Sequence, residues 1–493
     1  MSQQNISIVA AFIIYLSVMM FIGIYFYRRT QNMSDYILGS RKLGAWVISM
    51  SAEASDMSGW MLMGLPGYAY IAGLNAGWIA LGLGLGTWAN WKLVAARLRK
   101  YTELANNSLT LPDFLLNRYQ DKSNLLRIVP AVFILIFFII YTSSSFVASG
   151  KLFETVFGLP YVWALVLGGA VVIFYTSVGG FLAVVWTDFI QGIMMFCAIF
   201  LVPVMAAYAL GGISATESAI LASNPNFFAP LTKPDGSAMT FVELISLLGW
   251  GLGYFGQPHI LVRFMAIRSL GALRHATRIA MTWVVVSLAA AVLVGMVGRP
   301  FLANELTGAG AEKVFLVMTH ELFSPFFAGI ILSAVLAAIM STVSSQLLVA
   351  SSAFAQDLYH TMLRKDASEN ELVWVNRIST FAIAAVAMVL ALNPDSFILD
   401  IVAYAWAGFG AAFGPAILAS LFWRRATRNG ALAGIVVGGL TVLIWKQLAL
   451  FGLYEIIPGF ILSSLAIYIV SKMDAPPSEE ITAVFDEVEN SGI

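Results

Sequence analysis

The sequence predicts an all-α polytopic protein that crosses a membrane many times. Of its 493 residues, 59% are hydrophobic and only 11% are charged, whereas soluble proteins are about a quarter charged. Apolar runs of roughly twenty residues recur along the chain, and each is long enough to cross about 30 Å of hydrocarbon as a helix. This composition excludes a soluble enzyme, a disordered chain and a basic nucleic-acid-binding domain.

Thirteen transmembrane helices are expected from these runs. The ranges are 6–27, 44–70, 73–96, 128–149, 160–182, 188–211, 241–262, 278–298, 326–352, 373–393, 398–421, 429–450 and 454–471. They form a single transmembrane domain over 1–472. A polar tail follows at 473–493, for which a solvated conformation is expected.

The distribution of lysine and arginine predicts the orientation in the membrane. Connections after the odd-numbered helices, together with the tail, hold 22 of the 27 basic residues, among them Arg28 and Arg29. Cytoplasmic loops carry an excess of Lys and Arg. The N-terminus is therefore expected outside and the C-terminus in the cytoplasm.

Polar residues interrupt the second expected helix, 44–70. The segment Ser51–Trp60 holds two carboxylates, Glu53 and Asp56, together with serines and a glycine. Such a run predicts a break in the helix, whose free carbonyls and nearby hydroxyls would bind a hard cation such as sodium. Alternatively, Asp56 caps a helix or pairs with a buried cation, and Glu53 is solvated near the membrane edge.

Four glycines and a proline interrupt the seventh expected helix, 241–262. Three residues at intervals of four would share one face while helical geometry holds: Trp250, Tyr254 and Pro258. They would form a small apolar cup, to which Gln257 adds a polar contact. The alternative is ordinary close packing of helices through small residues.

The two interrupted helices open two blocks of five helices, 44–211 and 241–421. Because five is odd, the second block is inserted upside down relative to the first. Interrupted helices in matching positions indicate an inverted-repeat transporter with a site near the middle of the membrane. One extra helix precedes the two repeats and two follow them.

The ninth expected helix, 326–352, carries a patch of neutral oxygens. Ala338, Ser341 and Thr342 stand at i, i+3 and i+4, so one carbonyl and two hydroxyls point to the same place. Such oxygens suit sodium if another helix supplies the remaining ligands. The alternative is that both hydroxyls bond to carbonyls one turn earlier.

Two further polar positions are candidates because polar groups inside a membrane are costly. Tyr141 begins a polar patch in the fourth helix, and this patch is expected to face the same inner cavity as Asp188. Asp188 is expected to begin the sixth helix at its cytoplasmic end, either as a helix cap or along an inner exit path.

No enzyme motif accompanies these features, and the protein is not expected to be an enzyme. The four histidines are scattered, and the sequence contains no H-E-x-x-H, G-x-S-x-G or Walker motif. With one cysteine, the chain cannot form an internal disulfide.

The sequence resembles the sodium:solute symporter family, and within it the bacterial members that carry proline. The similar stretches span nearly the whole chain outside the extreme tail: Ser51–Gly67, Gly249–His259, Met340–Thr342, Tyr404–Pro415 and Tyr454–Gly459. The resemblance implies a LeuT-like fold in the bacterial inner membrane and sodium-coupled symport of L-proline by alternating access. Sodium, L-proline and the lipid bilayer are then the expected partners, with no organic cofactor, nucleic acid or obligate protein partner.

The resemblance also implies roles for individual residues. Sodium would be bound by the carbonyls of Ala54, Met57 and Ala338 and the hydroxyls of Ser341 and Thr342, with Asp56 as the acid that couples sodium to transport. The expected proline-binding residues are Ser58, Gly59, Tyr141, Trp250, Tyr254, Gln257 and Pro258. Arg41 and Asp188 would lie near the cytoplasmic gate.

Glu53 departs from the pattern of the family, where a small residue is expected. Its carboxylate would add a second contact for a cation or a proton. Three alternatives therefore remain open: a symporter of the same family for pantothenate, a sugar or another amino acid; coupling to protons instead of sodium; and a channel or membrane sensor.

Overall fold

The computed structural model describes residues 3–27, 38–178 and 180–491. In these ranges the secondary structure is helical, apart from isolated β-bridges. Ten helical segments of the described chain are long and apolar enough to cross a membrane. The prediction of an all-helical polytopic membrane protein is thereby confirmed. Arg28 and Arg29, which contribute to the charge asymmetry, lie outside the described residues.

Most expected spans correspond to one long helix each. These are α1 (Gln3–Tyr27), α8 (Leu125–Phe157), α9 (Tyr161–Val178), α10 (Phe181–Ala209), α14 (Leu270–Phe301), α16 (Pro325–Ser352), α17 (Glu369–Leu390), α18 (Ile398–Phe422), α19 (Arg428–Leu448) and α20 (Ile456–Met473).

The second and seventh expected spans are broken, as the sequence predicts. The second consists of α3 (Ala45–Asp56), non-helical backbone at Met57 and Ser58, the π-helical turn η2 (Trp60–Gly64) and α4 (Leu65–Ala72). The seventh consists of α12 (Phe241–Leu248), the 3₁₀ segment η5 (Gly249–Gly256) and α13 (Pro258–Ala266). Gln257 between them has extended backbone, because the residue before a proline avoids the α-helical region.

The third expected span bends along its length, and short helices cap both ends of the bundle. The third span comprises η3 (Gly73–Ala76), α5 (Gly77–Ala89), η4 (Asn90–Val94) and α6 (Ala95–Leu104). Other short helices are η1 (Gly39–Arg41), α7 (Leu111–Tyr119), α11 (Ile213–Ser223), η6 (Gly308–Lys313), α15 (Val314–Leu322), η7 (Ala353–Leu363), η8 (Leu450–Gly452) and α21 (Glu479–Glu489).

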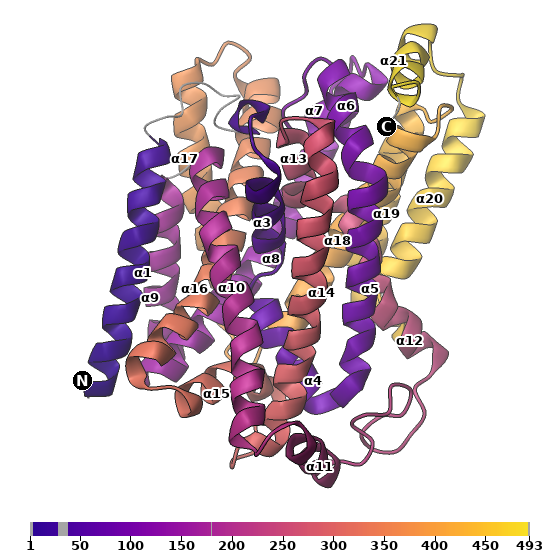
Figure 1. The fold of residues 1–493 in the computed structure, drawn as a ribbon. Coiled ribbons are helices and arrows are strands. Elements are labelled where there is room, and N and C mark those ends of the chain that lie inside the picture. Colours follow the sequence, from indigo (N-terminus) through magenta and orange to yellow (C-terminus); the bar gives the residue numbers. More distant parts are fainter. Residues whose placement is uncertain (1–2, 28–37, 179, 492–493) are drawn as a thin grey trace.

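The two broken spans lie inside the bundle, and the chain ends lie at its opposite ends (Figure 1). The half-helix α3 packs against α10, α13, α14 and α16, while η5 packs against α5 and α18. In Figure 1 the N-terminus of α1 is at the bottom near α15, and α21 is at the top beside α6 and α7. The broken segments are thereby held away from lipid, where unpaired backbone groups would be costly.

Glycine allows η5 to approach α5 at van der Waals distance. A Cβ atom on Gly86 would lie 2.2 Å from the carbonyl oxygen of Gly251, and a Cβ on Gly251 would lie 2.2 Å from that of Gly82. Only glycine fits on both sides of this contact. The glycine run of the seventh span therefore serves close helix packing as well as the break.

The C-terminal tail, which the structure describes up to residue 491, packs against the bundle, so the expectation of a solvated tail is wrong for its helix. Its helix α21 packs on α6, with Phe485 and Val488 buried. Arg424 also donates two hydrogen bonds, of 2.7 and 2.8 Å, to the carboxylate of Asp486. Apolar residues at helical spacing within an acidic segment account for this docking.

The placement of Asp188 at the start of a helix is also wrong. The helix α10 begins at Phe181, so Asp188 lies about two turns inside it and is fully buried. Its carboxylate therefore cannot cap the helix. The expected start was too late because the polar pair Thr187–Asp188 resembles a helix boundary.

We predict that Gly86→Ala destabilises the protein while Gly84→Ala does not. The methyl group at position 86 would meet a backbone oxygen, and overpacking of this kind costs about 1–3 kcal/mol. A methyl group at position 84, on the same helix, would have no atom within 4 Å, so alanine there keeps its advantage in helix propensity. Thermal unfolding in detergent compares the two variants, and equal melting temperatures would contradict the prediction.

Candidate functional site

At the break after α3, one backbone carbonyl oxygen accepts three hydrogen bonds. The oxygen of Asp56 accepts hydrogen bonds from the indole of Trp60 (3.0 Å), the hydroxyl of Tyr141 (3.2 Å) and the backbone N–H of Ser58 (3.0 Å). Buried backbone groups must be paired, above all in a membrane. These bonds hold the interrupted segment in one conformation and bring α8 against it.

The side chain of Asp56 joins the two broken spans. Its Oδ2 accepts a 2.7 Å hydrogen bond from the hydroxyl of Tyr254 in η5, while Oδ1 has no hydrogen-bond partner. Both residues are buried. A carboxylate oxygen without a donor is available to a positively charged group.

Four of the five oxygens expected for sodium lie together between α3 and α16. The hydroxyl of Ser341 donates to the carbonyls of Ala54 (2.7 Å) and Ala338 (3.2 Å), and that of Thr342 donates to Ala54 (3.4 Å). We call these four oxygens the α3–α16 oxygen cluster. Among the described residues, the hydrogen bonds of the cluster do not include the fifth residue, Met57, although its carbonyl belongs to the same break.

The oxygen cluster suits a hard monovalent cation. Hard cations of this size take several oxygen ligands at about 2.3–2.6 Å, and oxygens 2.7–3.4 Å apart can share one such ion when the hydroxyl protons turn away. The described residues hold no group of three or more His, Cys, Asp and Glu side chains that would suit a transition metal.

Aromatic side chains surround the break in a shell that extends beyond the expected residues. Trp250 packs on Trp60 (ring centres 6.4 Å apart) and on Tyr454 (5.7 Å). Tyr254 packs edge-on against Trp406 (4.9 Å), whose indole donates a 2.7 Å hydrogen bond to the carbonyl of Trp250. Trp406 therefore contacts both Trp250 and Tyr254 in η5.

The three residues expected on one helical face have different surroundings. The segment Gly249–Gly256 is a 3₁₀ helix, with three residues per turn, so a spacing of four no longer keeps one face. Trp250 and Tyr254 meet the break of α3, whereas Pro258 begins α13 and lines a separate cavity. Gln257 directs its amide nitrogen to the carbonyls of Gly253 (3.1 Å) and Trp406 (3.3 Å).

Ser58 and Gly59 belong to the break itself. The hydroxyl of Ser58 accepts a weak 3.4 Å bond from the N–H of Trp60. A Cβ on Gly59 would lie 2.6 Å from that of Ala148, so glycine permits α8 to approach here. Glu53 points elsewhere, because its carboxylate accepts a 3.1 Å bond from the indole of Trp91 in η4.

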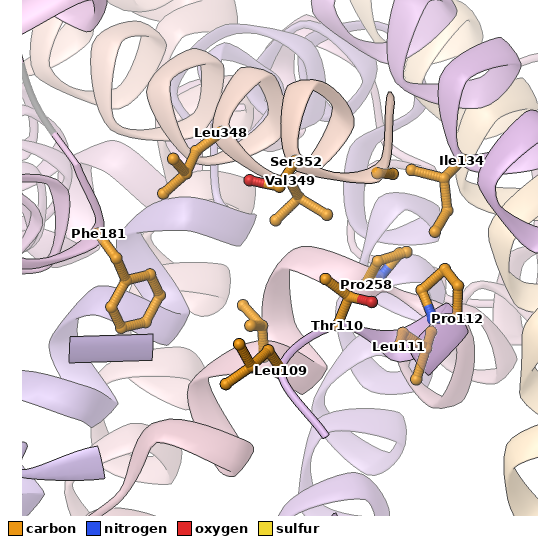
Figure 2. Close-up of a pocket in the computed structure, with 12 residues that line it drawn as sticks. Leu109, Thr110, Leu111, Pro112, Ile134, Phe181, Pro258, Leu348, Val349 and Ser352 are labelled. Atoms are coloured by element: carbon orange, nitrogen blue, oxygen red, sulfur yellow. The ribbon is translucent and has the colours of Figure 1, made fainter. Parts of the chain in front are cut away.

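A small cavity lies beside Pro258, next to the start of α7. Figure 2 shows side chains of α7, α8, α10, α13 and α16 converging on it. The lining includes Pro258, Ile134, Phe181, Leu348 and Thr110. The cavity offers about 20 Å³ to water, room for about one molecule.

A buried ion pair lies close to this cavity and ties four helices together. Arg263 in α13 contacts Asp188 in α10 (3.1 Å), and neither side chain is exposed. The guanidinium also donates to Ser51 of α3 (3.2 Å), Ser345 of α16 (2.6 Å) and the carbonyl of His259 (2.7 Å). Ser51 in turn donates to Asp188 (2.7 Å).

Arg41 holds the segment before α3 against the same end of the bundle. Its guanidinium donates to the side chains of Asn107 and Thr102 (3.1 Å each) and to the carbonyls of Ser108 (2.9 Å) and Met265 (2.7 Å). All four acceptors are uncharged. Arg41 thus connects the start of α3 with the end of α13 and with the α6–α7 connection.

Several residues of the site are absent from the sequence-based expectations. The main ones are Arg263, Ser345 and Trp406. Because the expected span ends at residue 262, Arg263 counts in the sequence analysis only among the basic residues that predict the orientation. A cation within the apolar segment Pro258–Ala266 is the signal that would have identified it. No local pattern singles out Trp406, since its role depends on contact with η5.

The comparisons with known proteins agree with these features. The sodium:solute symporter family matches residues 36–438. The chain is 51% identical over 483 residues to the "Sodium/proline symporter" of Escherichia coli (strain K12), covering 97% of this chain and 95% of the relative. It is 48% identical over 491 residues to the "Osmoregulated proline transporter OpuE" of Bacillus subtilis (strain 168), covering 99% of each.

Solved structures share the fold. A Na+-coupled sialic acid symporter in a substrate-bound outward-open state matches with a TM-score of 0.78 at 20% identity, over 96% of this chain and 99% of that one. Mhp1, a nucleobase-cation-symport-1 family transporter, matches with a TM-score of 0.53 at 12% identity, over 92% and 98%. From the family match over residues 36–438 and the near full-length similarity to the bacterial relatives, the chain belongs to the sodium:solute symporter family.

Proposed function

We propose that the protein takes up L-proline together with sodium by alternating access. The observation that carries this proposal is the arrangement around α3, where Ala54 contributes to the oxygen cluster and Asp56, two residues later, reaches Tyr254. A cation and an organic substrate would thus order the same segment. The names of the two bacterial relatives support proline as the substrate.

The proposed topology has thirteen crossings, with two inverted repeats preceded by α1 and followed by α19 and α20. The long helical run Trp60–Leu104 would then hold the end of one crossing and the whole of the next, since the chain reverses around η3. The termini at opposite ends of the bundle support an odd number of crossings (Figure 1). With the N-terminus outside, the Figure 2 cavity opens toward the cytoplasm.

In this proposal sodium replaces the hydroxyl–carbonyl bonds of the oxygen cluster. The Ser341 and Thr342 hydroxyls turn their lone pairs to the ion, which the carbonyls of Ala54, Ala338 and Met57 also bind. Because the ion bridges α3 and α16, it fixes the conformation of the break. The same segment carries Asp56, Ser58 and Gly59 toward the substrate.

Proline would bind beside the break, with its ring against Trp250 and Tyr254. Its ammonium group is complementary to the unpaired Oδ1 of Asp56, while Tyr141 and Gln257 border the site. Asp188, with Arg263, and Arg41 would hold the cytoplasmic side closed until α3 and α13 separate. Glu53 receives no coupling role, since Trp91 engages its carboxylate.

The energy available to one sodium ion suffices for concentrative uptake. The membrane potential contributes roughly 2.3 kcal/mol per charge at 100 mV, and a tenfold sodium gradient adds about 1.4 kcal/mol. Together, about 3.7 kcal/mol supports accumulation of several hundredfold at one sodium per substrate. Coupling requires each ligand to increase the affinity of the other by the same factor.

Uptake of radiolabelled L-proline into proteoliposomes tests the proposed function. An inward sodium gradient should drive accumulation above the equilibrium level, and a proton gradient without sodium should not. Accumulation with protons alone would overturn sodium coupling and redirect attention to Glu53. Absence of proline uptake under either gradient would overturn the proposed substrate, and competition by pantothenate, sugars and other amino acids would then identify the solute.

We predict that Ser341→Ala raises the sodium concentration for half-maximal uptake by roughly tenfold, because one oxygen ligand is lost. Ser333→Ala on the same helix is the matched control, since its buried hydroxyl bonds only to the carbonyl of Gly329 (2.8 Å). Sodium activation curves at saturating proline provide the measurement. The same curve for both variants would remove Ser341 from the sodium site.

We predict that removing Asp188 or Arg263 alone destabilises the protein more than removing both. Asp188→Leu leaves a buried guanidinium without its counter-charge, which costs about 3–5 kcal/mol, whereas apolar replacement of a whole pair is often neutral. Thermal unfolding of both single variants and the double variant gives the order. Asp486→Leu, which breaks the exposed pair with Arg424, should change little; a double variant less stable than either single variant would contradict the prediction.

A further inference from the structure

Three buried polar groups near the break have atoms without a hydrogen-bond partner. They are Oδ1 of Asp56, Oε1 of Gln257 and both ring nitrogens of His259, and none of the three side chains is exposed. An unpaired buried polar group typically costs about 1–3 kcal/mol, so three around one place require a reason. Asp56 and Gln257 are already assigned to the proposed site, whereas His259 has no assigned role.

The ring of His259 packs against two aromatic side chains of α8. It packs edge-on against Tyr141 (ring centres 6.0 Å apart), which bonds to Asp56, and against Phe138 (5.6 Å). Phe138 is one turn from Ile134, which lines the cavity together with the neighbouring Pro258. His259 thus contacts a residue that bonds to Asp56 and directly follows a residue that lines the cavity.

The unpaired atoms differ in their hydrogen-bonding character. Asp56 offers an acceptor, and so does Gln257, because its amide nitrogen must face the carbonyls of Gly253 and Trp406. An imidazole ring carries at least one N–H donor. The ammonium of an amino acid therefore fits the first two residues and its carboxylate fits His259.

The backbone reinforces this polarity. Pro258 and His259 are the first residues of α13, a helix of nine residues. The first N–H groups of a helix lack partners within it and favour an anion. Pro258 has no N–H, and the N–H groups of Ile260 and Leu261 already bond to the carbonyl of Gln257, so this end of α13 offers the N–H of His259. Arg263 on the same helix is not available, because its nitrogens already bond to Ser51, Asp188, Ser345 and the carbonyl of His259.

We propose that His259, together with the amino end of α13, binds the carboxylate of the transported amino acid. This inference rests on the proposed function, since it assigns the two ends of a zwitterion to the two broken spans. The ammonium lies at Asp56 and Gln257, and the carboxylate lies at His259. The site thereby selects cyclic or linear amino acids over their neutral-carboxyl analogues.

Inhibition of sodium-driven proline uptake by unlabelled L-proline and by L-prolinamide tests the carboxylate contact. His259→Leu should weaken inhibition by L-proline roughly 10- to 100-fold, the effect of one hydrogen bond to a charged group. Inhibition by L-prolinamide should change less than about threefold by the same reasoning. His259→Gln keeps an N–H donor and should retain most of the preference for L-proline, and His320→Leu, at an exposed histidine, is the matched control.

The outcomes separate this inference from the proposed function. The carboxylate contact is overturned if His259→Leu weakens inhibition by L-proline and by L-prolinamide equally. It is also overturned if inhibition by L-proline is unchanged. Intrinsic tryptophan fluorescence measures sodium binding in the absence of substrate. Unaltered sodium binding in the variant establishes that it is folded. If His259→Leu does not fold, loss of the preference for L-proline in His259→Gln overturns the inference; failure of the unmodified protein to take up proline instead overturns the proposed function.

Discussion

The interruption of the second span at Met57 and Ser58 is the constraint on which the rest of the site depends. Opening a helix inside a membrane exposes backbone groups that lipid cannot satisfy. The three donors on the carbonyl of Asp56 come from η2, from α8 and from the break itself. Satisfying this one oxygen therefore fixes where Trp60 and Tyr141 lie, and with them the wall of the proposed substrate site.

The Arg263–Asp188 pair performs the corresponding task for the other broken span. A guanidinium and a carboxylate with no exposure are costly unless further hydrogen bonds support the pair, and here two serines and a backbone carbonyl supply such bonds, while Oδ1 of Asp188 has no partner. The pair joins α3 and α13 to α10 and α16. Both half-helices are consequently held to the same two long helices, and Arg41 adds a second attachment at the ends of α3 and α13.

The sequence predicts the parts of this arrangement that depend on local composition. Long apolar runs define the spans, glycine and proline locate the two breaks, and the i, i+3, i+4 spacing places Ala338, Ser341 and Thr342 together. Features that arise from tertiary contact were missed. The sequence locates the break at η5 but not its 3₁₀ winding, which forms where the segment packs against α5 and α18, and it does not show that α21 meets α6.

The contacts explain how two different ligands can be coupled through one short segment. Ala54 faces α16 through its carbonyl, Asp56 faces η5 through its side chain, and only one residue separates them. Displacement of either residue moves the other, because both belong to the last turn of α3. In the proposed mechanism, a cation that bridges α3 to α16 would therefore also set the position of the carboxylate proposed to meet the substrate. The reverse holds equally, since coupling between two sites is reciprocal, and no long-range pathway through the bundle is needed.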